Sequence, residues 1–397
     1  MKKLSDFVSN IDESVTLAAA KRAKDLASQG KNIIDLTLGQ PDFSTPELIG
    51  EAAIDSIHSG KASFYTQASG LPELKSAVRN YWEKYYGYAI EDKEILVTTG
   101  AKFALYAFFQ SVLDKGDEVI IPAPYWVSYV DQVKMSGGHP VVVSTLQEND
   151  FKITVEQLEA VKTEKTKVLL LNSPSNPTGM IYSKEELLAL GNWAVANDLL
   201  ILADDIYHRL VYNKSVFTAL SSLSEAIRQH TIVINGVSKT FAMTGWRIGL
   251  AVGDSEIIAA MTKIAGQTTS NPSTVAQYAA IEAFNSDETA VEKMRTAFEA
   301  RLNLIHPMIN QIPGFEAIKP NGAFYLFPKV EKAMALKGYD NVTDFATAIL
   351  EETGVALVTG EGFGSPVHVR LSYATDLESL TEAVKRLKNW MEVAHDR

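Results

Sequence analysis

The most chemically suggestive stretch of the chain is Ser238–Gly249, which carries one lysine, Lys239. Its neighbours are small, hydroxylated or aromatic, and one arginine, Arg247, follows eight residues later. A lysine with little charge around it can hold a neutral amine, and that is the form that attacks a carbonyl to give a Schiff base. Most lysines lie on surface loops instead, so this segment alone leaves both interpretations open.

Short apolar segments separated by helical ones must position such a lysine. We expect seven strands, at Glu94–Thr98, Glu118–Ile121, Pro140–Val143, Lys167–Asn172, Leu199–Asp204, Thr231–Asn235 and Gly249–Val252. Continuous apolar strands that alternate with helices are typical of a mainly parallel sheet covered on both faces. The predicted fold class is therefore α/β, with a large domain built on a seven-stranded, mainly parallel sheet.

Helical signals flank this region on both sides. They predict a helix over 13–29, a helix capped by Thr45 that runs to about His58, a long amphipathic helix after about residue 285 and another around 343–353. Capping boxes are expected at Thr154-x-x-Gln157, Ser183-x-x-Glu186 and Thr375-x-x-Glu378. We expect residues 46–285 to form the large domain, and 1–45 with 286–397 to form a smaller α+β domain from both termini.

Composition excludes several classes of function. The 48 acidic and 37 basic residues give a net charge of −11, without a basic cluster, which disfavours nucleic acid as a partner. With zero cysteines there is no thiol catalysis or thiolate metal site, and the seven histidines show no HxxxH or HxH pairing, so we expect no metal. Met1–Asp6 lacks the apolar segment of a signal peptide, and no apolar run could span a membrane, so we expect a cytoplasmic protein.

Polar groups follow the strands at the edge where doubly wound sheets bind ligands. Gly100, Ala101 and Lys102 open a helix after the first strand, and its backbone N–H groups suit a phosphate, although an ordinary tight turn fits equally well. After the second strand comes Trp126, which could stack on a planar ring, although a lone tryptophan is more often a core residue.

An amide, a carboxylate and a phenol come next at the same edge. Asn176 lies in a rigid turn after the fourth strand, and Asp204 ends the fifth, where a carboxylate needs a cation or donor unless it caps a helix. Tyr207 follows it. A pyridine-aldehyde phosphate would use each of these groups. No GxGxxG or Walker motif supports a nicotinamide or ATP site.

These segments resemble those of the class I aminotransferases, which are fold-type-I pyridoxal-phosphate enzymes, along nearly the whole chain. The prokaryotic aspartate aminotransferases are the most similar subgroup. The matching segments are Ser238–Gly249, Asn176–Gly179, Asp204–Tyr207, Tyr125–Tyr129, Gly39–Phe43 and Arg370–Ser372. Several independent motifs in the family's order make a chance match negligible.

The resemblance implies pyridoxal 5′-phosphate as cofactor. Lys239 is similar to the Schiff-base lysine and proton shuttle, Asp204 to the partner of the pyridinium nitrogen, and Trp126 to the residue that stacks on the ring. Tyr207 and Asn176 match the residues that hydrogen-bond its phenolic oxygen. The implied phosphate ligands are Gly100, Ala101, Ser238, Arg247 and, from a second subunit, Tyr65, which implies a homodimer with shared active sites.

The resemblance also suggests a substrate. Arg370, with Gly39 beside it, is similar to the clamp on the α-carboxylate. Lys102, Ser14 and Thr16 match residues that bind a distal carboxylate, which favours ping-pong transfer from L-aspartate to 2-oxoglutarate, giving oxaloacetate and L-glutamate.

Other interpretations stay open at this point. If Lys102 faces the cofactor phosphate instead, an aromatic or broad specificity fits. A lyase or synthase on the same fold would keep every cofactor residue. The sensor half of a transcription regulator is disfavoured because no basic recognition helix is evident.

Overall fold

The computed structural model describes residues 4, 8, 11 and 15–393. Its largest sheet has the strand order β2-β8-β7-β6-β5-β3-β4, and β8 alone runs antiparallel to its neighbours. The strands are β2 (Ile95–Thr98), β3 (Glu118–Ala123), β4 (His139–Ser144), β5 (Thr166–Asn172), β6 (Leu200–Asp204), β7 (Thr231–Gly236) and β8 (Gly249–Val252). The prediction of an α/β fold with a seven-stranded, mainly parallel sheet is confirmed, and each strand lies within a few residues of its expected place.

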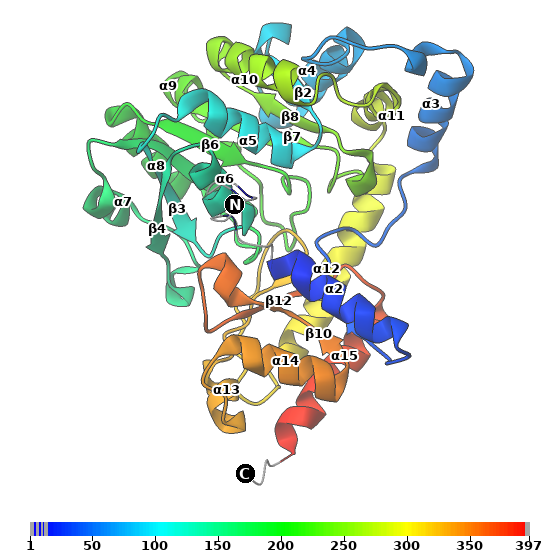
Figure 1. Cartoon of the computed structure of the whole chain (residues 1–397), viewed down its shortest axis with the longest axis vertical. Helices are drawn as coiled ribbons and strands as arrows, with labels where there is room; N and C mark the ends of the chain where they lie inside the picture. Colours follow the sequence, from blue (N-terminus) through cyan, green and yellow to red (C-terminus); the bar gives the residue numbers. More distant parts are fainter. Residues whose placement is uncertain (1–3, 5–7, 9–10, 12–14, 394–397) are drawn as a thin grey trace.

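Helices cover both faces of this sheet (Figure 1). Successive residues of β6 show why: Leu202 packs with α5 and α10, whereas Ile201 and Ala203 face the opposite layer. Side chains alternate across a strand, so a strand that is apolar throughout needs cover on both sides. The covering helices are α4 (Pro72–Tyr86), α5 (Ala101–Val112), α6 (Ser128–Met135), α7 (Val155–Val161), α8 (Lys184–Ala196), α9 (Glu225–His230), α10 (Ser255–Thr268) and α11 (Thr274–Asn285).

A second core lies at the other end of the molecule, where C-terminal elements meet α2 (Figure 1). Its strands form a parallel pair, β1-β10, and an antiparallel sheet, β11-β12-β9. These elements are α2 (Val15–Ser28), β1 (Ile34–Asp35), α12 (Thr289–Ile309), β9 (Tyr325–Leu326), α13 (Glu331–Lys337), α14 (Val342–Thr353), β10 (Val355–Ala356), β11 (Val358–Thr359), β12 (Val369–Ser372) and α15 (Leu377–Glu392). The exact domain boundaries stay a prediction.

The expected helix starts are partly right. The capping boxes at Thr154 and Ser183 are both formed. The box at Thr375 is wrong, because Asp376, one residue later, accepts from the backbone of Ser379 at 2.8 Å. A carboxylate at that position is a strong acceptor for the free N–H groups of the first turn.

The predicted cap at Thr45 is also wrong. Pro46 occupies the N-cap position of α3 (Glu47–His58) without a side-chain bond. The Thr45 hydroxyl instead donates to the Ala242 carbonyl and accepts from the indole of Trp246, at 2.9 Å each. This threonine therefore joins the N-terminal segment to the loop after Lys239. No helix in the described parts of the chain is long and apolar enough to cross a membrane.

Candidate active site

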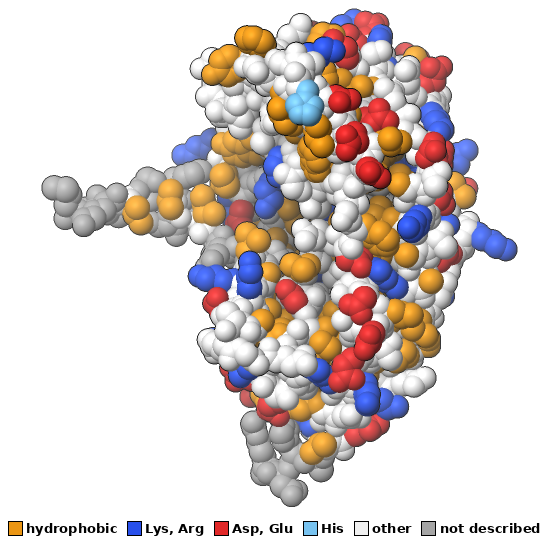
Figure 2. Space-filling model, turned by 90° about the vertical axis from the view of Figure 1, so that its right-hand side faces the viewer, with side chains coloured by type: hydrophobic (Ala, Val, Ile, Leu, Met, Phe, Trp, Pro, Cys, Tyr) orange, Lys and Arg blue, Asp and Glu red, His pale blue; other side chains and the backbone are white. Residues whose placement is uncertain are grey.

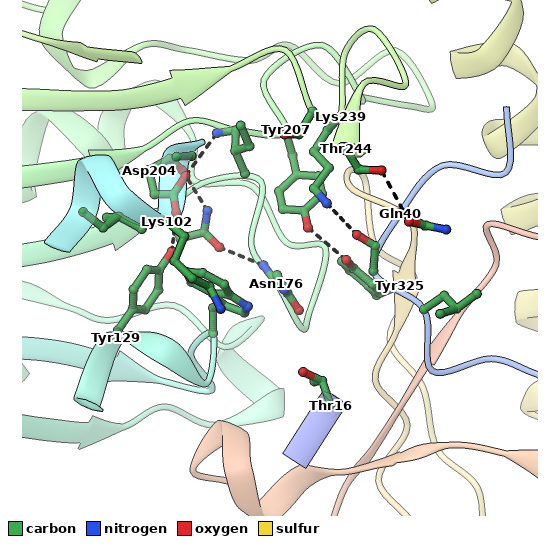
Figure 3. A pocket seen from close by; sticks show the side chains of 18 of the residues that line it. Thr16, Gln40, Lys102, Tyr129, Asn176, Asp204, Tyr207, Lys239, Thr244 and Tyr325 are labelled. Carbon is green, nitrogen blue, oxygen red and sulfur yellow. Dashed lines mark hydrogen bonds between the residues drawn. The ribbon is translucent and has the colours of Figure 1, made fainter. Parts of the chain in front are cut away.

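A cavity of about 410 Å³ opens at the carboxyl ends of β5, β6 and β7 (Figure 3). The β9–β12 sheet and the start of α2 close its other side. The side chains and backbone that line it come from distant parts of the sequence: Thr16, Leu17, Leu38, Gly39, Gln40, Ala101, Lys102, Leu105, Trp126, Tyr129, Asn172, Asn176, Asp204, Ile206, Tyr207, Ser238, Lys239, Thr244, Arg247, Tyr325 and Arg370. Most of the residues singled out in the sequence therefore meet in one place.

Lys239 lies in the loop after β7 and points into this cavity. Its Nζ donates to the carbonyl of Gly39 at 2.5 Å. Burial, together with the charges of Arg370 and Arg247 and against the opposing charge of Asp204, lowers the pKa of Lys239 to about 7. A large fraction of the amine is then neutral near pH 7, which is the form that a lysine nucleophile needs.

Asp204 presents a buried carboxylate to the same cavity. It accepts from the phenol of Tyr129 at 2.6 Å and from the backbone N–H of Ile206 at 3.2 Å. Burial raises the pKa of Asp204 to about 6, while these two donors and Lys239 hold it down. Above pH 6 the group is an anion in an apolar setting, and such an anion favours a cationic partner such as a protonated ring nitrogen.

Arg370 has a fully buried guanidinium, and its hydrogen bonds leave one nitrogen, Nε, without a partner among the described atoms. It donates from Nη1 to Asn176 at 3.0 Å and from Nη2 to the Thr37 carbonyl at 2.7 Å. The rings of Tyr325 and Phe363 flank it, with centroids at 4.5 and 5.1 Å. Because neither partner is an acid, the buried charge is uncompensated, and it suits a ligand carboxylate.

The first turn of α5 and Arg247 form a site for an anion. Gly100 adopts a φ of +82°, and a Cβ at this position would collide with the Arg247 guanidinium. The glycine therefore lets the arginine lie against the start of the helix, where the N–H groups carry partial positive charge. Ala101 and Ser238 line the cavity beside it. These donors fit a phosphate.

Lys102, Trp126 and Thr16 also line the cavity, and Lys102 follows Ala101 in the first turn of α5. The ammonium of Lys102 lies 4.9 Å from the centre of the indole and forms no ion pair with the acids that the structure describes. Burial and the nearby Arg247 charge lower the pKa of Lys102. Trp126 also meets the ring of Tyr129 edge-on at 5.4 Å. The indole thus faces the cavity, where it could contact a planar ring.

Two of the predicted site residues that the structure describes do not line this cavity, and a third lies outside the described residues. Gly100 lies behind it, in contact with Arg247. Tyr65 is 91% exposed and does not line it. Ser14 lies outside the described residues. The proposed roles of Tyr65 and Ser14 therefore depend on more than the described part of one subunit.

Sequence reasoning missed two phenols of the cavity. Tyr129 belongs to the Tyr125–Tyr129 motif, and its place one helical turn after Trp126 is a signal that it faces the same way. Tyr325 lies in an apolar strand, where nothing in the sequence distinguishes it from a core residue. Its hydroxyl is 2.9 Å from that of Tyr207 (Figure 3).

The chain is similar to known aminotransferases over most of its length. A model of the family "Aminotransferase class I and II" matches residues 31–387. An asparagine–oxo-acid transaminase of Streptococcus mutans is 63% identical over 99% of this chain and 100% of its own. An aspartate aminotransferase of Geobacillus stearothermophilus is 50% identical over 98% and 99%.

Solved structures agree with these matches. A structure described as the aspartate aminotransferase from Thermus thermophilus with maleate is 39% identical. It superposes with a TM-score of 0.93 and covers 98% of this chain and 100% of its own.

Proposed function

The chain belongs to the class I and II aminotransferases, and from that premise we propose that it moves the amino group of L-aspartate to 2-oxoglutarate by a ping-pong mechanism. The family's cofactor is pyridoxal 5′-phosphate, which when bound supplies an electron sink for the substrate's Cα. The observation that carries the proposal is the meeting of Lys239, Asp204 and Arg370 in one cavity.

In this proposal Lys239 holds the cofactor and then acts as the base. Its Nζ would attach the cofactor and, once freed by the incoming amino acid, would take the proton from the substrate's Cα and later give it back. A pKa of about 7 suits a group that must both accept and release a proton. The bond to the Gly39 carbonyl places the amine beside the residue proposed to contact the substrate.

Three parts of the cofactor, its ring nitrogen, its phenolic oxygen and its phosphate, would each be held by groups of the protein in the orientation that this proton transfer needs. The Asp204 carboxylate keeps the ring nitrogen protonated, and the Tyr129 phenol fixes that carboxylate in place. Tyr207 and Asn176 bind the phenolic oxygen. Arg247 and the start of α5 bind the phosphate.

The α-carboxylate of the substrate is assigned to Arg370. The protein bonds from Nη1 and Nη2 orient the guanidinium, and its burial excludes the water that would weaken a charge–charge contact. The distal carboxylate is assigned to Lys102, and the family resemblance adds Ser14 and Thr16 to that role. A cation without an acidic partner suits a dicarboxylate better than an aromatic side chain.

A second donor, L-asparagine, is favoured by one specific observation, the 63% identity to an asparagine–oxo-acid transaminase. The amide and the acid have nearly the same shape and differ in charge. They share every assignment at the reacting end, and Lys102 is the group that would distinguish them.

We also propose a homodimer in which Tyr65 reaches the partner's phosphate site. Apolar side chains are exposed on α3 and the turn after it: Leu48 (68%), Ile57 (57%) and Phe64 (75%). Figure 2 faces this side of the molecule and shows hydrophobic side chains exposed among charged ones. Contiguous exposed apolar surface favours contact with another protein.

Two-substrate steady-state kinetics test the proposed reaction. With L-aspartate or L-asparagine as donor and 2-oxoglutarate as acceptor, we expect parallel double-reciprocal lines and stoichiometric L-glutamate. Aspartate should have the higher kcat/KM. A preference for asparagine would make the second donor the physiological one. Product formed in excess of one equivalent per site without any oxo acid would indicate a lyase and contradict the proposal.

A further inference from the structure

Tyr325 has a buried phenol that lies between Tyr207, proposed to bind the cofactor, and Arg370, proposed to bind the substrate. It begins β9 and pairs with Ser372 of β12, two residues beyond Arg370. The side chain is fully buried by the rest of the chain and reaches the cavity wall. Its ring faces the Arg370 guanidinium at 4.5 Å, and its hydroxyl lies 2.9 Å from that of Tyr207.

The hydroxyl pair shares a limited number of protons. Each neutral phenol has one O–H to donate and lone pairs to accept with. Neither the Tyr207 hydroxyl nor the Tyr325 hydroxyl forms another hydrogen bond within the described chain. If Tyr207 donates to Tyr325, it has no proton left for a ligand in the cavity. If Tyr325 donates, the Tyr207 proton is free to point at the ligand.

The charge environment favours Tyr325 as the donor. Burial raises the pKa of both phenols and the Arg370 guanidinium opposes the rise at both. Arg370 lies against the Tyr325 ring, whereas the Asp204 carboxylate also raises the pKa of Tyr207, which stands well above the usual value. The more acidic hydroxyl of a pair is the better donor. The Tyr325 hydroxyl also lies close to Gly39, since a Cβ added at this glycine would be 3.1 Å from the phenol oxygen.

We propose that Tyr325 is a positioning residue that directs the Tyr207 proton toward the cofactor's phenolic oxygen while its ring holds the α-carboxylate clamp, Arg370. The inference rests on the proposed function, since it gives Tyr207 and Arg370 the roles described above. It adds a physical link between the group that binds the cofactor's oxygen and the group that binds the substrate's carboxylate.

The hydroxyl is tested with Tyr325→Phe, which keeps the ring. The readout is the pH midpoint at which the visible absorption band of the cofactor-loaded enzyme changes. A donor to the phenolic oxygen stabilises the deprotonated form, so its loss should raise that midpoint by about 0.5 to 1 pH unit. Tyr207→Phe should raise it at least as much.

A double variant separates a positioning role from a general structural one. If Tyr325 acts through Tyr207, Tyr325→Phe should add no further shift in a Tyr207→Phe background. The matched control is Tyr373→Phe, a fully buried phenol of the same core that does not line the cavity and should leave the midpoint unchanged. An additive shift in the double variant, or no shift from Tyr325→Phe alone, would overturn the inference.

The ring is tested with Tyr325→Leu and maleate as a dicarboxylate probe. Tyr325→Phe should bind maleate nearly as well as the unchanged protein, and Tyr325→Leu should bind it about 5-fold more weakly, because Arg370 loses a cation–π contact. Equal affinities in the two variants would contradict the second half of the inference. If the unchanged enzyme shows no spectral response to any amino acid, the proposed function fails instead, whichever way the Tyr325 variants behave.

Discussion

The two ends of the active-site cavity differ in how firmly the protein holds them. At the reacting end, Lys239, Asp204 and Arg370 are each bonded to other protein groups at 2.5 to 3.2 Å. At the group assigned to the distal carboxylate, the ammonium of Lys102 lies 4.9 Å from an indole, is near the Arg247 charge, and forms no ion pair with the acids that the structure describes. Preorganised groups accelerate the chemistry, whereas a loosely held cation adapts to the substrate. This difference indicates that the hydrogen-bonded groups determine which reaction takes place. The weaker contacts of Lys102 then determine which amino acid is accepted.

The largest effect should come from removing the amine at the reacting end. Lys239→Ala should lower the turnover number by at least about 10⁴-fold, since one group supplies both the covalent attachment and the proton transfer. Lys239→Arg keeps a cation and should lose as much, because a guanidinium does not deprotonate. Initial rates with L-aspartate measure the turnover of both variants. Normal turnover in Lys239→Ala would contradict the assignment of Lys239 as the cofactor-binding lysine and base.

Two consecutive buried aspartates provide a matched pair. Asp204→Asn should lower kcat about 10²- to 10³-fold, because the ring nitrogen loses its anion. Asp205 points away from the cavity, where Tyr86 donates to it at 3.1 Å, and burial raises its pKa well above the usual value. Asp205→Asn keeps the shape of a side chain that does not line the cavity and should change kcat less than about 3-fold. Similar losses of kcat in both variants would contradict the proposal that Asp204 acts on the cofactor and Asp205 does not.

The pKa of Lys239 gives a pH dependence for cofactor attachment. Below pH 7 the protonated amine cannot attack, so the rate of attachment to the cofactor-free protein should fall about tenfold per pH unit, or about 100-fold from pH 7 to pH 5. Stopped-flow absorbance between pH 5 and pH 9 follows this step. A midpoint near pH 10 would mean that the surroundings do not lower the pKa of the Lys239 amine.

Arg370→Lys tests the α-carboxylate clamp at the reacting end. Lysine keeps the charge but loses the planar pair of donors, and we expect kcat/KM for L-aspartate to fall about 10- to 100-fold, mostly through KM. L-Asparagine should lose activity by the same factor, because both donors share the α-carboxylate. A loss confined to one donor would place Arg370 at the distal end.

The smallest effect should come from the distal end. Lys102→Met keeps the length of the side chain and removes its charge, so kcat/KM should fall about 10-fold for L-aspartate and less than about 3-fold for L-asparagine. Competition between the two donors measures this directly. Equal losses for both would assign Lys102 to the cofactor phosphate.

The sequence predicted the reacting end well because its residues follow strands. Lys239 follows β7 and Asp204 ends β6, so the carboxyl edge of one sheet brings them together. Tyr325 was missed because a tyrosine in a two-residue strand has no local signal, and only the packing of β9 brings it to the cavity. The caps at Thr45 and Thr375 were wrong because a distant indole and a neighbouring carboxylate compete for the same hydrogen bonds.

The distal end was predicted least completely. Thr16 lines the cavity as expected, but Ser14 lies outside the described residues. Tyr65 is exposed, and its role needs a second copy of the chain. Contacts between subunits leave no periodic pattern in a single sequence, which explains why the resemblance rather than spacing supplied this residue.

A single-turnover half-reaction tests the central claim most directly. The cofactor-loaded enzyme is mixed with L-aspartate alone, and the visible band is followed before and after 2-oxoglutarate is added. We predict rapid loss of the band with one oxaloacetate per site, full recovery with 2-oxoglutarate, and neither change in Lys239→Ala. A band that L-aspartate leaves intact, or that 2-oxoglutarate fails to restore, would contradict the account.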